Sequence, residues 1–207
     1  MEESDLSLLD RWGAGDSVAG NVLFKRHFAS LYRFFEHKTN GEVDDLVQDT
    51  FLQCLKGRDT FRRQSTFRTY LLAIARHVLL QHWRVRARAQ LMTDVEEVSI
   101  ASLGTSIRSR LARGADRARL IAVLQTLPLD QQLLLEMYYW ESLDRDQLAE
   151  VFDVEPATIG SRLFRARATL HEAMRTESDQ HAAGFAGQDA FDAWARSLAA
   201  DEPTRPS

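Results

Sequence analysis

Apolar residues recur three and four positions apart along most of this chain, and that spacing predicts amphipathic helices. Residues 5–37 fit two helices, because the apolar pattern stops at Gly13-Ala14-Gly15-Asp16 and resumes from Val18 to Phe35. A third helix is expected to begin at Val43, after a turn at residues 38–41. Its apolar face would hold Val43, Leu46, Val47, Phe51, Cys54 and Leu55. The fourth predicted helix has the apolar stripe Phe67, Leu71, Ile74, Ala75 and Val78.

The second half of the chain has its own helical pattern. An apolar helix from Arg117 ends before Pro128, and we expect Asp130 to cap the next helix. The following segment has helix-turn-helix spacing, with Asp144 as a cap and Asp153-Val154-Glu155 as the turn. The inward residues of these helices would be Leu133, Leu134, Met137, Tyr138, Leu148, Ala149, Phe152, Ile159, Leu163 and Ala166. A plain three-helix bundle would show the same spacing.

The pattern therefore predicts an all-α protein with two small helical domains, residues 1–89 and 117–175. Residues 90–116 lose the periodicity and read as a linker. The remaining residues, 176–207, form a C-terminal extension in which residues 189–199 could make one short helix. One side of that helix would hold Phe191, Trp194, Ala195 and Leu198. Two readings of the extension stay open: it packs on the second domain, or it folds back and masks a binding face.

Charge is distributed unevenly along the 207 residues. The formal net charge is −4, and the extension alone carries six acidic residues against two arginines. The rest of the chain is therefore neutral overall, with its arginines clustered, and local patches decide nucleic-acid binding. No apolar run approaches the ~20 residues of a membrane span, and the acidic N-terminus lacks a signal segment. The single Cys54 excludes an internal disulfide. We expect a cytoplasmic protein without membrane insertion.

Two helices carry contrasting surfaces. On the third helix, Asp45, Gln48, Asp49 and Leu52 fall on one face, which is either solvated or a docking face for a basic partner. The segment from Phe61 to Arg88, which includes the fourth helix, is basic and aromatic. Its arginines are interleaved with Phe61, Phe67, Tyr70 and Trp83, a combination that suits single-stranded nucleic acid unless these rings belong to the core.

The sequence offers no catalytic constellation. Its histidines show no metal-ligand spacing, and it has neither a glycine-rich phosphate loop nor a nucleophile motif. We therefore expect no enzyme activity, no cofactor and no metal site.

The segment from Val43 to Arg88 resembles region two of the sigma-70 family, in particular its small extracytoplasmic-function group. Asp45-Leu46-Val47-Gln48-Asp49-Thr50-Phe51 is similar to a segment that docks on the clamp helices of RNA polymerase. Ser65 to Leu71 and Ile74 to His77 resemble the segment that opens promoter DNA. The resemblance implies polymerase contacts at Asp45, Gln48, Asp49 and Leu52. It implies contacts with the minus-ten DNA at Phe61, Ser65, Phe67, Tyr70, His77 and Arg84.

Two residues of this segment depart from the family pattern. Tyr70 stands where the family commonly has tryptophan, and His77 where it commonly has asparagine. Both keep some capacity for stacking or hydrogen bonding, so the role is retained while the preferred base can differ.

The segment from Leu127 resembles region four of the same group. Thr158 to Arg167, TIGSRLFRAR, is close to the signature of the minus-thirty-five reader. The resemblance implies contacts with that element at Thr158, Ser161, Arg162, Phe164, Arg165 and Arg167. Gly160 replaces the usual basic residue, so one expected contact is missing, and Asp153 replaces the usual glycine of the turn.

The two resemblances lie in the order that the family has, and together they imply a sigma factor. Its partners would be core RNA polymerase, through the clamp helices and the upstream-facing flap, and promoter DNA, with an anti-sigma factor as a further partner. The protein would join the nucleoid when bound to polymerase. The alternative is a stand-alone helix-turn-helix regulator. A purely protein-binding adaptor would leave the arginine clusters unexplained.

Overall fold

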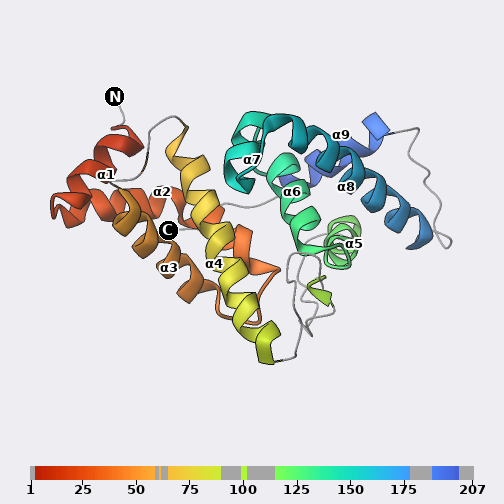
Figure 1. The fold of residues 1–207 in the computed structure, drawn as a ribbon, viewed down its shortest axis with the longest axis horizontal. Coiled ribbons are helices and arrows are strands. Elements are labelled where there is room, and N and C mark those ends of the chain that lie inside the picture. The colour runs from red at the N-terminus through yellow and green to blue at the C-terminus, as the bar shows by residue number, and fades with distance from the viewer. Residues whose placement is uncertain are drawn as a thin grey trace.

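The structure is a computed structural model that describes residues 3–58, 61, 65–89, 99–101, 115–177 and 188–200. These ranges hold nine α-helices and no strand beyond an isolated Ser99–Pro128 bridge, so the all-α prediction is confirmed (Figure 1). The helices are α1 (Asp5–Gly13), α2 (Ser17–Glu36), α3 (Val43–Gly57), α4 (Phe67–Ala89), α5 (Ala115–Leu124), α6 (Leu129–Tyr139), α7 (Arg145–Phe152), α8 (Pro156–Glu177) and α9 (Gln188–Ala200). Within this part of the chain no helix is both long and apolar enough to cross a bilayer.

The first two helices meet through a close contact that a glycine allows. The Asp16 side chain caps α2 by accepting hydrogen bonds from the backbone N–H groups of Val18 and Ala19, at 2.9 and 3.2 Å. A Cβ at Gly20 would lie 2.5 Å from the Trp12 ring, so only glycine lets α1 lie this close to α2. The predicted break between the two helices is confirmed.

Helices α3 and α4 pack on α2 and complete the N-terminal core. Most residues of the predicted stripes are buried, including Val47 and Phe51 of α3 and Leu71 and Ala75 of α4, while Leu55 is half-buried. Trp83 is 1% exposed, so this ring belongs to the core and is not available for stacking on bases. Ile74, predicted inside, is half-buried.

The helix-turn-helix is formed by α7 and α8. Asp144 makes the predicted cap: its carboxylate accepts from the Gln147 N–H, and the Gln147 side chain accepts from the Asp144 N–H, each at 2.9 Å. Asp153 ends α7 in the left-handed region with φ of 52°, the conformation that glycine usually supplies at this position. An aspartate can replace that glycine because its short polar side chain tolerates the region.

The prediction that Asp130 caps α6 is wrong. The N-cap of α6 is Pro128, with no side-chain hydrogen bond to the first turn. Asp130 lies inside that turn, where its carboxylate binds two arginines from other helices, Arg76 at 2.6 Å and Arg162 at 3.1 Å. Sequence spacing could not show this, because both partners are distant along the chain.

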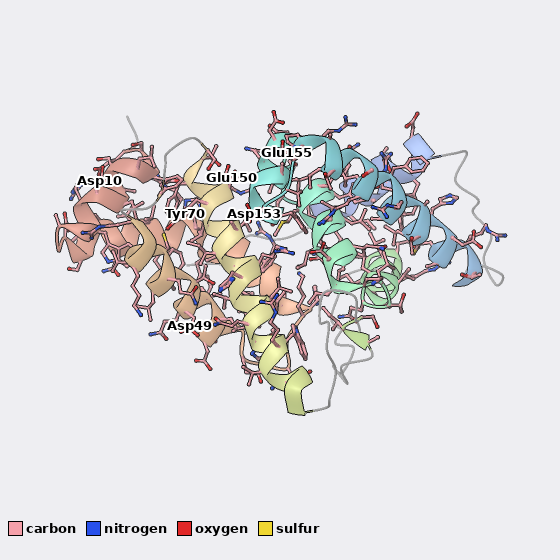
Figure 2. All side chains as sticks on the ribbon, viewed as in Figure 1. Asp10, Asp49, Tyr70, Glu150, Asp153 and Glu155 are labelled. Carbon is pink, nitrogen blue, oxygen red and sulfur yellow. The ribbon has the colours of Figure 1, made fainter. Side chains whose placement is uncertain are left out.

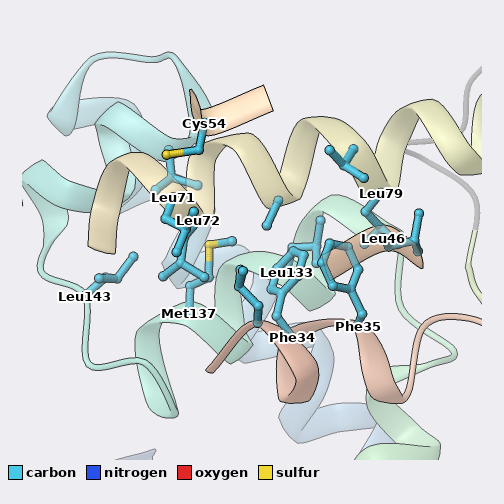
Figure 3. Close-up of a cluster of buried hydrophobic side chains, with 14 of the residues drawn as sticks. Phe34, Phe35, Leu46, Cys54, Leu71, Leu72, Leu79, Leu133, Met137 and Leu143 are labelled. Carbon is cyan, nitrogen blue, oxygen red and sulfur yellow. The ribbon is translucent and has the colours of Figure 1, made fainter. Parts of the chain in front are cut away.

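One hydrophobic core joins the two halves of the molecule (Figure 3). Phe34 and Phe35 of α2 lie near Leu133 and Met137 of α6, and α4 packs along α7. A buried ion pair crosses the same boundary: the ammonium of Lys38, 1% exposed, contacts the Glu136 carboxylate. Two side chains of the turn at residues 38–41, Lys38 and Thr39, are buried. Most of the predicted linker, 90–116, lies outside the described residues.

Candidate functional site

The four polar and apolar residues predicted on one side of α3 do share an exposed face. Asp45, Gln48, Asp49 and Leu52 are all exposed, and Leu52 shows 45% of its surface. They point outward because Leu46, Val47 and Phe51 on the opposite side of the same helix are anchored in the core. Figure 2 labels Asp49 on this helix.

Beside this face lies an apolar hollow of about 240 Å³ between α1, α2 and α3. Its lining includes Trp12, Phe24 and Phe51, with Gln48 and Leu52 shared between the hollow and the α3 face. The rings support one another: Phe24 and Phe51 have centroids 4.9 Å apart, and Phe24 remains 37% exposed. We call Asp45, Gln48, Asp49, Leu52 and this hollow the docking surface. From the sequence alone, Trp12 and Phe24 read only as apolar residues of the first two helices.

At the start of α4, the aromatic residues predicted to meet DNA take two different positions. The ring of Tyr70 stacks on that of Phe61, with centroids 4.3 Å apart and planes 17° apart. Burial, with a smaller contribution from the nearby Cys54 thiol, raises the pKa of Tyr70 to about 12, so the hydroxyl stays protonated. Phe67 is only 3% exposed and packs edge-on against His27 at 5.2 Å. Phe67 is therefore a core residue that backs the Phe61–Tyr70 pair.

The rest of that predicted set lies along α4 and just before it. His77 and Arg84 are exposed, and they follow Tyr70 at intervals of seven residues, so the three share one side of the helix. Ser65 contacts the second domain: its hydroxyl donates a hydrogen bond of 2.5 Å to the Glu150 carboxylate of α7. Glu150 and Tyr70 are both labelled in Figure 2.

Acidic residues of the second domain engage the basic residues of α4. The guanidinium of Arg68 contacts the Glu141 carboxylate, and that of Arg76 lies 2.6 Å from Asp130. Arg76 also lies over the Phe152 ring, 4.6 Å from its centroid. In this conformation two α4 arginines are therefore paired with carboxylates of the second domain.

The recognition helix α8 has an outer face that nothing in the described chain covers. Ile159, Leu163 and Ala166 are buried beneath it, while Phe164 is 75% exposed. Ser161 and Arg165 are exposed beside Phe164, and Thr158 is half-buried. A Cβ at Gly160 would meet no atom within 4 Å, so packing does not require glycine there.

The two arginines on the flanks of this face are both paired. Arg162 binds Asp130, which links α8 to Arg76 of α4. Arg167 binds Asp192 of the C-terminal helix α9. The family resemblance implied DNA contacts for both arginines. The sequence gave no sign of their carboxylate partners, because these lie 32 and 25 residues away.

Two family models match this chain. Residues 23–89 match sigma-70 region 2 and residues 117–170 match sigma-70 region 4, together more than half of the chain. The chain is 25% identical over 178 residues to the ECF RNA polymerase sigma-E factors of Salmonella typhimurium and Escherichia coli, covering 81% of this chain and 92% of each relative. That of Haemophilus influenzae is 25% identical over 174 residues, 79% of this chain and 92% of the relative.

Solved structures share the fold. The sigma factor RpoE of Bartonella quintana, in complex with the anti-sigma factor NepR, matches with a TM-score of 0.58 at 23% identity, over 74% of this chain and 95% of that one. CnrH, in complex with the cytosolic domain of CnrY, matches with a TM-score of 0.61 at 23% identity, over 85% of this chain and all of that one. On the two family models and these relatives, the chain belongs to the sigma-70 family as an ECF-type sigma factor that directs transcription initiation.

Proposed function

We propose that this sigma factor binds core RNA polymerase through the docking surface. Asp45 and Asp49 supply negative charge for a basic partner, and the adjacent hollow accepts an apolar side chain from it. The observation that carries the proposal is that this charged face and an apolar hollow adjoin on one exposed surface. A stand-alone DNA-binding regulator has no need of such a surface, because its helix-turn-helix alone would read the operator.

We propose further that the two DNA-facing surfaces act on different forms of DNA. The outer face of α8, with Thr158, Ser161, Phe164 and Arg165, suits the major groove of the upstream element. The flanking Arg162 and Arg167 would add phosphate contacts once released from their carboxylates. On α4, the Phe61–Tyr70 stack, His77 and Arg84 suit unpaired bases and their backbone, with Ser65 at the edge and Phe67 as support.

Simultaneous reading of both elements requires the domains to separate. Elements centred near minus ten and minus thirty-five lie about 25 base pairs apart, or ~85 Å at 3.4 Å per pair. Here α4 packs against α7, and we infer that this packed arrangement does not place both surfaces on their elements. The chain between α4 and α5 has 25 residues. Fully extended, it would reach ~85 Å, which is of the required order.

Core polymerase and promoter DNA are therefore the proposed partners. An anti-sigma factor is a third, because the structural relatives RpoE and CnrH are both complexes, RpoE with the anti-sigma factor NepR and CnrH with the cytosolic domain of CnrY. The polymerase would supply the chemistry, and this chain the recognition. The protein would then work in the cytoplasm, on the nucleoid.

Run-off transcription with purified core polymerase tests this function directly. A separate binding measurement tests the docking surface: Asp49→Arg should weaken binding to core polymerase, because it places like charge against a basic partner. Glu172→Arg, a charge reversal on an exposed residue of α8, is the matched control and should bind core normally. Promoter binding without any copurification with core would instead support the stand-alone regulator.

A further inference from the structure

The C-terminal helix α9 is a fixed part of the second domain. Its Phe191 and Ala195 are fully buried in a cluster with Leu120, Leu170 and Met174. The indole N–H of Trp140 also donates to the carbonyl of Ala195 at 3.2 Å. Apolar contact and a hydrogen bond from the Trp140 side chain to the α9 backbone together set the position of α9 against α6 and α8.

That position brings one carboxylate of α9 into the domain. Asp192 is 5% exposed and accepts a hydrogen bond of 2.6 Å from the Tyr139 hydroxyl. Burial, reinforced by the hydrogen bond to Asp192, raises the pKa of Tyr139, so this hydroxyl remains a donor. The second partner of the carboxylate is the guanidinium of Arg167, whose Nε lies 3.3 Å from Oδ1.

Arg167 lies at the edge of the face that would meet DNA. It follows Phe164 by three residues, so the two side chains are neighbours on the helix surface. The guanidinium side chain is 24% exposed, whereas the Asp192 side chain is 7% exposed. The carboxylate therefore holds the guanidinium from the protein side, and a phosphate arriving from solvent would have to compete with it.

We propose that α9 limits the DNA affinity of the recognition helix, because Asp192 occupies Arg167 and withholds it from phosphate. This inference rests on the proposed DNA-reading function of α8. Asp192 acts here as a positioning residue: it touches no DNA and sets what Arg167 can bind. The sequence predicted a helix at residues 189–199 but not this contact, because a net charge describes the extension as a whole.

The test measures binding of the full-length protein to a 30-base-pair duplex. Asp192→Asn keeps the shape and an acceptor for Tyr139 but removes the charge. One added phosphate contact should steepen the salt dependence by about 0.9 in log–log slope, with a gain of roughly tenfold at 50 mM salt and roughly threefold at 200 mM. Asp189→Asn is the matched control, since it makes the same charge change at an exposed residue of α9 and should leave binding almost unchanged.

A double-mutant cycle identifies the arginine responsible. Arg167→Gln should matter little in the native background and should abolish the gain in the Asp192→Asn background. Ala195→Gln places a larger side chain at a fully buried position and should displace α9 without changing any charge. This variant should also raise DNA affinity, and it replaces Asp192→Asn in the test if that variant folds poorly. Thermal unfolding reports the fold of each variant.

Three results would overturn the inference. Equal binding by Asp192→Asn and Asp189→Asn would show that no contact is withheld. A gain that persists with Arg167→Gln would assign the effect to general charge. The third result is that the wild type binds polymerase but neither it nor any variant binds duplex DNA at 50 mM salt. That result would contradict both the DNA-reading role of α8 and the limit that α9 sets on it.

Discussion

The two surfaces that we propose meet DNA differ in how accessible they are. On α8, Phe164 is 75% exposed, and Ser161 and Arg165 are exposed beside it. At the start of α4, Tyr70 is stacked on Phe61, Phe67 is buried, and Ser65 is bound to Glu150 of the other domain. The first surface is open in the isolated protein, and the second is partly covered.

This difference fits the two proposed ligands. Duplex DNA is present before initiation, so a surface that reads it can be formed in advance. Unpaired bases exist only after melting, and exposed rings waiting for them would leave an apolar patch in water. On the proposed function, the Phe61–Tyr70 stack and the Ser65–Glu150 contact between the domains would limit access to the second surface until polymerase and promoter separate the domains.

The largest expected effect comes from the ion pair that joins the two domains. Glu136→Ala would leave the Lys38 ammonium, 1% exposed, without its carboxylate, and we expect a loss of about 3–5 kcal/mol in unfolding free energy. Glu172→Ala, which removes an exposed pair with Arg175 on α8, should leave the unfolding free energy almost unchanged. Denaturant titration checks both. A small loss for Glu136→Ala would mean that the domain contact contributes little.

Substitutions of two phenylalanines distinguish a residue that stabilises the core, Phe67, from one proposed to contact DNA, Phe164. Phe67→Ala should cost about 3–5 kcal/mol of stability, because it opens a cavity in the core. Phe164→Ala removes a ring that is 75% exposed, so stability should stay nearly constant while promoter binding weakens. Thermal unfolding and DNA binding are measured on both variants. Equal losses of stability and of DNA binding in the two variants would contradict the assignment of Phe67 to the core and of Phe164 to DNA contact.

Tyr70→Ala tests the covered surface by itself. Stacking of one base on an aromatic ring is worth about 1–3 kcal/mol, and it is gained only after the base leaves the duplex. We expect open complexes to weaken more than closed ones, as reported by permanganate reactivity of promoter thymines. Tyr70→Phe is the control, since it keeps the ring. Equal loss in both complexes would argue against a melting role.

Arg165→Ala tests the open surface. A bidentate arginine–guanine contact contributes about 1–3 kcal/mol of discrimination. Selection from a randomised promoter library should therefore show relaxed preference at one upstream position. Arg175→Ala, on the same helix beyond this face, serves as the control. An unchanged preference in Arg165→Ala would remove this residue from the readers.

The sequence predicted every helix of this fold because each has its own local signals. The Asp144 capping box, the turn at Asp153 and the apolar stripes are all encoded within a few residues. The exposed face of α3 followed from spacing in the same way. The pairing of Asp130 with Arg76 and Arg162, and of Asp192 with Arg167, could not be predicted, since such contacts depend on how helices pack.

The central claim is that the domains must part before both DNA elements are read. Ser65→Cys and Glu150→Cys place thiols where the native side chains meet at 2.5 Å, and a short reducible cross-linker can join them. Cys54 should not react, because it is fully buried and burial raises the pKa of its thiol to about 12. Glu172→Cys with Arg175→Cys, cross-linked within α8, is the control.

The measurement is promoter-dependent run-off transcription by cross-linked and reduced protein with core polymerase. The docking surface contains neither Ser65 nor Glu150, because it is formed by the exposed face of α3 and the hollow between α1, α2 and α3. The cross-linked protein should therefore still bind core polymerase. It should fail to transcribe, and reduction should restore transcription, while the control pair transcribes in both states. Full transcription by the cross-linked protein would contradict the account, because the domains would then read both elements without separating.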